Sequence, residues 1–202
     1  MDINVNYHSS IRIKNIYVDP YNINENSNDA IYVFITHSHY DHFSINDIKR
    51  VINDDSVFVC TVDVEKELKK IFDNKIICVE PNCDYEVGNI KFSTFPSYNI
   101  NKKFHPKNND WVGYIIEIDN VKYAILGDSD LTDEVKKIKC DVLFVPIGGT
   151  YTMNAIEASE LTNIIRPSLV IPVHYNGIVG SKDDEGKFLS KIDSSIRYML
   201  FV

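Results

Sequence analysis

Two features that often reveal a protein's class are missing from this chain of 202 residues: a dense set of cysteines and a long hydrophobic run. The apolar runs are only a handful of residues long, whereas a membrane-spanning helix needs roughly 20. The N-terminal segment MDINVNYHSS lacks the basic and apolar regions of a secretory signal. We therefore expect a cytoplasmic protein with no membrane partner.

The cysteines are too few and too scattered for a disulfide framework, and they form no C-x-x-C pair. We interpret them as reduced thiols with a structural role or none. They are Cys60, Cys78, Cys83 and Cys140.

Positive charge is also scarce. Lys and Arg number 21 against 29 Asp and Glu, which gives a net charge of −8. An acidic surface repels the phosphate backbone of nucleic acids, so no nucleic-acid partner is expected.

No repeat, low-complexity tract or flexible linker divides the chain, and we expect a single domain over residues 1–202. Strands outnumber helices in the pattern of apolar residues, which favours an α/β (α+β) layered fold with mixed sheets. One helix should begin at Ser44, capped by its hydroxyl, with Asp47 reaching back in a capping-box spacing. The predicted strands are 10–14, 16–19, 30–36, 56–61, 85–87, 90–95, 111–118, 121–126, 142–146, 169–173 and 197–201, and the other predicted helices are 63–72, 154–166 and 184–192.

Three predicted strands end at a side chain that can bind a metal ion. The run AIYVFIT leads into His37, VKYAIL leads into Gly127 and Asp128, and LVIPV leads into His174. In layered α/β folds the loops at strand ends build functional sites on a rigid base. These three segments could therefore meet at one rim.

The first of these strand ends continues into the cluster THSHYDHF. In an extended segment alternate side chains face the same way, so His37 and His39 should project together as a pair of metal ligands. Asp41 and His42 are adjacent and diverge unless the chain turns there, and a turn would present them as a second pair. Two such pairs suit two metal ions about 3.5–4 Å apart.

The segment His37–His42 matches the H-x-H-x-D-H motif, and the chain thereby resembles the metallo-β-lactamase superfamily of metal-dependent hydrolases. The downstream GDSD and IPVHYN are similar to that superfamily's bridging aspartate and last histidine. The phrases YVDPY, FPSYN, PIGGTYTMNAIEA and HYNGIVGSKDD resemble its small stand-alone branch, which is similar to ascorbate-6-phosphate lactonase.

The resemblance implies an αββα sandwich with one or two divalent metal ions in a cleft at one edge of the sheets. It implies that His37 and His39 hold the first ion, that Asp41, His42 and His174 hold the second, and that Asp128 lies between them. A metal-activated water or hydroxide would be the nucleophile, and Asp41 could orient it and accept its proton. Imidazole and carboxylate ligands suit Zn²⁺ first, with Mn²⁺ or Fe²⁺ as alternatives.

One histidine that many superfamily members place at a central strand end is absent from STFPSYN. His105 is the only candidate to replace it. The alternative is that His105 is an exposed loop histidine, which would leave the first site weaker and favour a single metal ion.

Two further residues are weighed against ordinary roles. His8 could border the cleft, but we expect it at the surface. Tyr151, in the loop GGTYTM, could line the pocket and stabilise an oxyanion as a catalytic residue, or it could simply pack.

We predict a metal-dependent hydrolase that acts on a small molecule: an ester, a lactone or a phosphorylated metabolite. The alternatives are an iron-dependent oxidoreductase of the same fold, a nuclease or phosphodiesterase, and a non-catalytic metal-binding domain. His39 weakens the iron alternative, since di-iron relatives of the oxidoreductase type usually carry glutamate at the second motif position.

Overall fold

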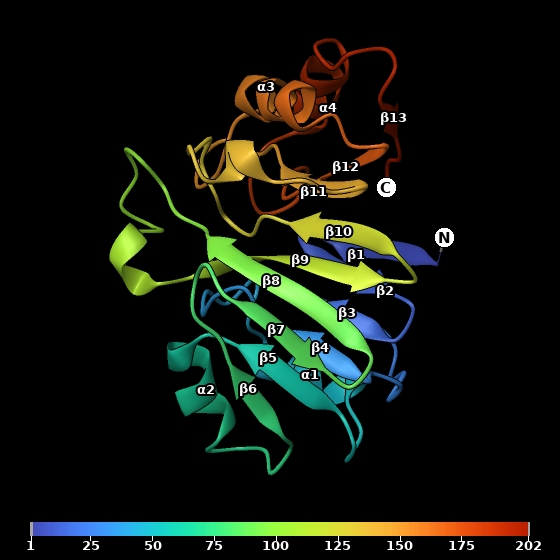
Figure 1. Ribbon diagram of the computed structural model, residues 1–202, viewed down its shortest axis with the longest axis vertical. Helices are drawn as coiled ribbons and strands as arrows, with labels where there is room; N and C mark the ends of the chain where they lie inside the picture. Colours follow the sequence, from blue (N-terminus) through green and yellow to red (C-terminus); the bar gives the residue numbers. More distant parts are fainter. Residues whose placement is uncertain (1, 202) are drawn as a thin grey trace. The chain divides into compact units, whose positions relative to one another are not determined.

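The computed structural model describes residues 2–201, which form two compact units (Figure 1). Unit 1 comprises residues 2–80 together with residue 201, and unit 2 comprises residues 81–200. Each unit contains one mixed β-sheet, so the expectation of mixed sheets flanked by helices is confirmed. The prediction of one domain over residues 1–202, whose end residues lie outside the described range, stays a prediction.

The sheet of unit 1 has six strands, and its spatial order follows the sequence from β1 to β6. The first three strands pair antiparallel, and β3 to β6 pair parallel. Two helices, α1 (Ile45–Val51) and α2 (Val62–Leu68), follow β4 and β5. The strands are β1 (Ile3–Tyr7), β2 (Ser10–Ile13), β3 (Ile16–Val18), β4 (Tyr32–Phe34), β5 (Val57–Cys60) and β6 (Ile76–Cys78).

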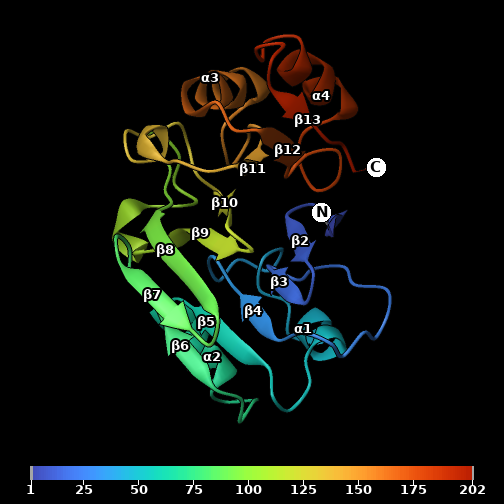
Figure 2. The same cartoon turned by 45° about the vertical axis from the view of Figure 1, so that its right-hand side comes forward.

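A hydrophobic core between sheet and helices holds unit 1 together. Figure 2 shows α1 next to β4, where Ile48 and Val51 of the helix pack with Val33 of the strand. Because these side chains leave water, the packing fixes the loop between β4 and α1 at both ends.

Helix α1 begins as predicted, because the Ser44 hydroxyl accepts a hydrogen bond from the Asp47 backbone N–H. The reciprocal half of the capping box is absent in the described structure. The Asp47 carboxylate instead accepts from the Ser44 hydroxyl, at 2.6 Å, and from the backbone N–H of Ile23, at 2.8 Å. Asp47 therefore connects the helix start to the segment before β4 rather than closing a capping box.

The sheet of unit 2 has seven strands in the order β13 to β7, again following the sequence. Strands β7 to β10 pair antiparallel, and β10 to β13 pair parallel. The strands are β7 (Asp84–Val87), β8 (Ile90–Pro96), β9 (Val112–Ile118), β10 (Val121–Ile125), β11 (Val142–Pro146), β12 (Leu169–Val173) and β13 (Arg197–Tyr198).

Helices α3 (Ala155–Ile165) and α4 (Lys182–Leu189) lie side by side next to β11 and β12 (Figures 1 and 2). Leu161 of α3 and Phe188 of α4 are buried in one cluster with Leu143 of β11. Two short 3₁₀ helices, η1 (Lys107–Asn109) and η2 (Val135–Lys137), lie in the connections.

Strands β11 and β12 have the predicted bounds, whereas β1 and β6 were not predicted. In β1 the sequence INVNY alternates half-buried and exposed residues, a period-two signal that the predicted set missed. Helix α4 begins at Lys182 instead of residue 184, because Ser181 and Asp184 form a capping box. Among residues 2–201, no helix is both long enough and apolar enough to cross a membrane.

Candidate metal centre

The loop between β4 and α1 carries the histidine cluster of unit 1. A tight turn closes it, because the backbone N–H groups of His42 and Phe43 both donate to the carbonyl of His39, at 3.0 and 2.7 Å. Asp41 and His42 thereby face the same region, with Asp41 Oδ2 and His42 Nε2 3.8 Å apart. Of the two alternatives left open by the sequence, divergence of Asp41 and His42 or a turn, the structure has the turn.

His37 and His39 project together, as the alternation of an extended segment predicts. His37 Nε2 lies 3.0 Å from His39 Nδ1. The ring of His42 is stacked at a tilt against that of His37, with centroids 4.1 Å apart. His37 and His42 are fully buried, and His39 is half-buried.

Asp19, directly after β3, forms hydrogen bonds with the loop that carries the histidines. Its Oδ2 lies 2.7 Å from His42 Nδ1 and accepts the Thr36 hydroxyl hydrogen at 2.7 Å, and its Oδ1 accepts the Thr36 backbone N–H at 2.8 Å. Complete burial raises the pKa of Asp19, while His42 and the bonds from Thr36 act in the opposite direction. No role for Asp19 was predicted from the sequence, although it belongs to the phrase YVDPY.

This network determines which ring nitrogens can bind a metal ion. The Thr36 hydroxyl gives its single hydrogen to Asp19, so at His37 Nδ1, 2.9 Å away, it can only accept. The Nδ1 atoms of His37 and His42 therefore carry hydrogens, and their Nε2 atoms are left as donors to a metal.

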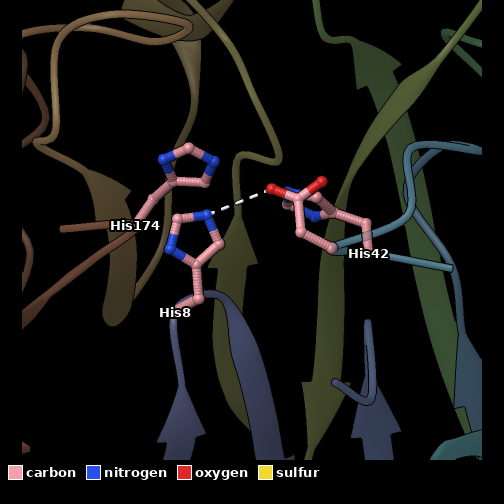
Figure 3. A group of neighbouring side chains, drawn as sticks. His8, His42 and His174 are labelled. Atoms are coloured by element: carbon pink, nitrogen blue, oxygen red, sulfur yellow. Dashed lines mark ion pairs between the residues drawn. The ribbon is translucent and has the colours of Figure 1, made fainter. Parts of the chain in front are cut away.

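His8 lies in the same unit, in the turn between β1 and β2. The expectation that it lies at the surface is wrong, because the residue is 6% exposed. Its Nε2 is 3.2 Å from Asp41 Oδ2 (Figure 3). β1 pairs with β2, β2 with β3, and β3 with β4, and these pairings place the turn of His8 near the loop after β4. No local sequence pattern shows this relation between strands.

In unit 2, Asp128 and His174 form a close pair. His174 Nε2 lies 3.1 Å from Asp128 Oδ1, and both side chains are buried. Asp128 follows β10 after Gly127, whose φ of 58° lies in the left-handed region. His174 follows β12 directly. The prediction that these two strand ends present metal-capable side chains to one another is thereby confirmed within unit 2.

His105 belongs to the same group of unit 2. It is 1% exposed, so its interpretation as an exposed loop histidine is wrong. One of its ring nitrogens lies within 4.8 Å of a carboxylate oxygen of Asp128. Its ring packs edge-on against Trp111, with centroids 4.4 Å apart.

Asn99 fastens the loop that carries His105. Its backbone N–H donates to the His105 carbonyl at 2.7 Å, and its side-chain amide donates to the carbonyls of Asp128, at 3.1 Å, and Tyr151, at 2.8 Å. Lys102 adds an ion pair with Asp130. Asn99 is thus a positioning residue that sequence reasoning missed, although it ends the phrase FPSYN.

Tyr151 is half-buried, and its ring packs edge-on against Phe104 with centroids 4.6 Å apart. Both residues belong to loops that Asn99 connects. Its expected role in lining a pocket stays a prediction.

Three buried residues of the two units have a strained backbone conformation. Among the non-glycine residues of the described chain that have a positive φ, the buried ones are His8, Asp19 and His174, at 58°, 47° and 58°. Such conformations are sparsely populated and tend to cluster at functional sites.

The donors of both units fit divalent metal ions. They are imidazole nitrogens and carboxylate oxygens, the ligand types of Zn²⁺ and Mn²⁺. Ligand atoms bound about 2.0–2.1 Å from one ion lie roughly 3.0–3.4 Å apart. The His37–His39 and Asp128–His174 separations, 3.0 and 3.1 Å, have this spacing. Each unit therefore presents atoms already spaced for coordination.

Comparison with known proteins gives a consistent result. A family model described as a beta-lactamase superfamily domain matches residues 7–174. A UPF0173 protein of Pyrococcus abyssi is 30% identical over 179 residues, which cover 85% of this chain and 79% of that protein. A UPF0173 metal-dependent hydrolase of Nanoarchaeum equitans is 28% identical, covering 88% of this chain and 84% of that protein. A crystal structure from Parabacteroides distasonis superposes with a TM-score of 0.80 at 25% identity, covering 98% of this chain and 91% of that one.

Proposed function

We propose that this chain, which belongs to the metallo-β-lactamase superfamily and is a metal-dependent hydrolase, hydrolyses a small ester, lactone or phosphorylated metabolite. The observation that carries this proposal is the donor arrangement on both units. Buried histidines and aspartates lie near strand ends in each unit, and in unit 1 Asp19 and Thr36 orient the rings of His37 and His42. The net charge of −8 favours a small-molecule substrate over a nucleic acid.

The metal ligands that we propose are those of the superfamily motifs together with His105. A bound divalent ion would supply Lewis acidity and lower the pKa of a coordinated water. Imidazole and carboxylate donors favour Zn²⁺, with Mn²⁺ or Fe²⁺ as alternatives. The proposed ligands are His37, His39, Asp41, His42, His105, Asp128 and His174.

The chain's own side chains have separate tasks in this proposal. Asp41 orients the attacking water and accepts its proton as a general base. Asp19 keeps His37 and His42 in the tautomer that leaves Nε2 as the donor. Tyr151 donates a hydrogen bond to the developing oxyanion.

A cytoplasmic location remains part of the proposal. The structure contains Cys60, Cys78, Cys83 and Cys140 as free thiols, which suits a reducing compartment.

The test compares purified wild-type protein with Asp41→Ala on a panel of lactones, carboxylic esters and phosphate esters, after native metal quantification. We expect turnover to fall by about 10²- to 10⁴-fold, the usual contribution of a general base. The matched control is Asp133→Ala, whose side chain is 88% exposed and should leave turnover unchanged. Wild-type turnover in a folded Asp41→Ala protein would contradict the role of Asp41, and absence of bound metal in the wild type would contradict the proposed centre.

A further inference from the structure

We infer that His8 is a direct metal ligand, which joins Asp41 and His42 in a three-residue binding group within unit 1. This inference rests on the proposed function, because it assumes that the chain binds a divalent ion through the loop after β4. His8 lies about 30 residues before the motif and stands outside the ligand set proposed above.

The position of His8 in the chain is the first reason. Tyr7 and Ser10 are paired across β1 and β2, so His8 and Ser9 form a two-residue turn. His8 has a φ of 58° at the first of these two positions. Glycine usually occupies such a position, because a side chain there adds conformational strain. The imidazole of a histidine at this position takes no part in forming the turn, so another role for it is expected.

The direction of the imidazole is the second reason. The side chain of His8 is 0% exposed, although the residue lies at a hairpin turn, and Figure 3 shows it directed toward the loop of His42. The rings of His8 and His42 are 6.2 Å apart between centroids and are inclined at 70°. Rings inclined in this way can direct one nitrogen each at a shared point without steric conflict.

The distances are the third reason. His8, Asp41 and His42 each offer one ligand atom, and these atoms lie within 4.8 Å of one another. His8 Nε2 is 3.2 Å from Asp41 Oδ2, within the roughly 3.0–3.4 Å that separates two ligand atoms on one ion. Two imidazoles and a carboxylate are also the protein ligands of several catalytic zinc sites that keep an open position.

A hydrogen bond from His8 to Asp41 is the competing explanation of the same 3.2 Å distance. In that case His8 would act on the metal only through Asp41, as a positioning residue. The two roles differ in magnitude, because loss of a residue that supports a ligand lowers metal affinity by about 10- to 100-fold. Loss of the ligand itself should exceed that range.

The experiment measures Zn²⁺ affinity by competition with a chromophoric chelator for the wild type, His8→Asn and His8→Gln. Asparagine adopts a positive φ readily, and glutamine retains an N–H donor of similar reach. We expect both variants to lose more than about 100-fold in affinity, beyond the effect of a supporting residue. Retention of affinity by His8→Gln to within that factor would overturn direct ligation.

The matched control is Lys14→Asn, at an exposed turn residue of the next hairpin with a φ of 53°. It should bind Zn²⁺ as the wild type does. If the wild-type protein binds no Zn²⁺, the proposed function itself is contradicted. If both His8 variants bind Zn²⁺ as tightly as the wild type does, only the role of His8 is contradicted.

A measurement on the wild type keeps the inference testable if the variants fail to fold, as judged by circular dichroism. In protein loaded with ¹¹³Cd²⁺ and labelled with ¹⁵N, direct ligation predicts scalar coupling between cadmium and the Nε2 of His8. The absence of this coupling, with couplings to His42 present, would overturn it.

Discussion

A single buried carboxylate supports two histidines of the loop after β4. Asp19 bonds to His42 directly and reaches His37 through the hydroxyl of Thr36. Since both rings depend on it for orientation and tautomer, its loss should affect two metal ligands at once.

We therefore predict that Asp19→Asn lowers Zn²⁺ affinity by about 10- to 100-fold, because an amide orients the imidazoles less firmly than a carboxylate. Chelator competition measures this change. The control is Asp29→Asn, which also loses a carboxylate bonded to its neighbours, here Arg12 and Tyr17. Equal affinity in Asp19→Asn and Asp29→Asn would refute the supporting role of Asp19.

At the residue scale, the motif histidines could be predicted because a short local pattern contains them. His8, Asp19 and Asn99 could not be predicted in the same way. Asp19 reaches Thr36 because Val18 of β3 pairs with Phe34 of β4, and this register depends on the whole sheet. Such residues receive their role from strand pairing rather than from their sequence neighbours.

At the scale of elements, the ends of strands β11 and β12 are packed so closely that the position of Gly148 affects that of His174. A Cβ atom at Gly148 would lie 2.1 Å from the backbone carbonyl oxygen of His174. Because the nearest atom belongs to the backbone rather than to a flexible side chain, a larger residue must displace the segment that carries His174.

We expect Gly148→Ala to destabilise the protein by about 1–3 kcal/mol, the usual cost of overpacking, and to weaken Zn²⁺ binding. Urea denaturation of the metal-free protein and chelator competition measure the two effects. Gly186→Ala is the matched control, because among the described residues nothing lies within 4 Å of a Cβ there, and α4 should gain about 0.5–1 kcal/mol. Wild-type stability in Gly148→Ala would show that the segment adapts freely.

The loop that carries His105 is also fastened to η2 by charge. Glu134 accepts hydrogen bonds from Lys107, at 2.7 Å, and from the Tyr98 hydroxyl, at 2.8 Å. The hydrogen bond from Lys107 lowers the pKa of Glu134 from 4.5 to about 2. The carboxylate is therefore stabilised in the folded state, and its contribution is present above the unfolded pKa and lost as the pH falls toward 2.

Accordingly, Glu134→Gln should destabilise the protein at pH 7 by about 1 kcal/mol, a value reduced for solvent screening of a partly exposed pair. The difference from the wild type should shrink as the pH falls from about 4.5 toward 2. Urea titrations at pH 7 and pH 3 measure it. Glu160→Gln, at an exposed position of α3, should change little at either pH. A loss in Glu134→Gln that is independent of pH would indicate packing rather than charge.

At the scale of the whole molecule, the strands with continuous apolar runs were predictable, whereas β1 and β6 were not. LVIPV and VLFVP are buried at every position, so composition alone identifies β12 and β11. β6 has only three half-buried residues and is defined by its pairing with β5. The division into mixed sheets followed from the spacing of turns and helices, whereas the register within each sheet depends on side-chain packing across strands.

The strand order of the two sheets has a consequence for how the protein is made. In both sheets every strand pairs with strands that are its immediate neighbours along the chain. Each pairing therefore closes a comparatively short loop, which favours rapid folding. All strands of the first sheet lie before residue 81, so on the ribosome that sheet can assemble strand by strand while the second is still being synthesised. Three histidines of the N-terminal loop and His8 would then be in place before the last histidine of the chain has been translated.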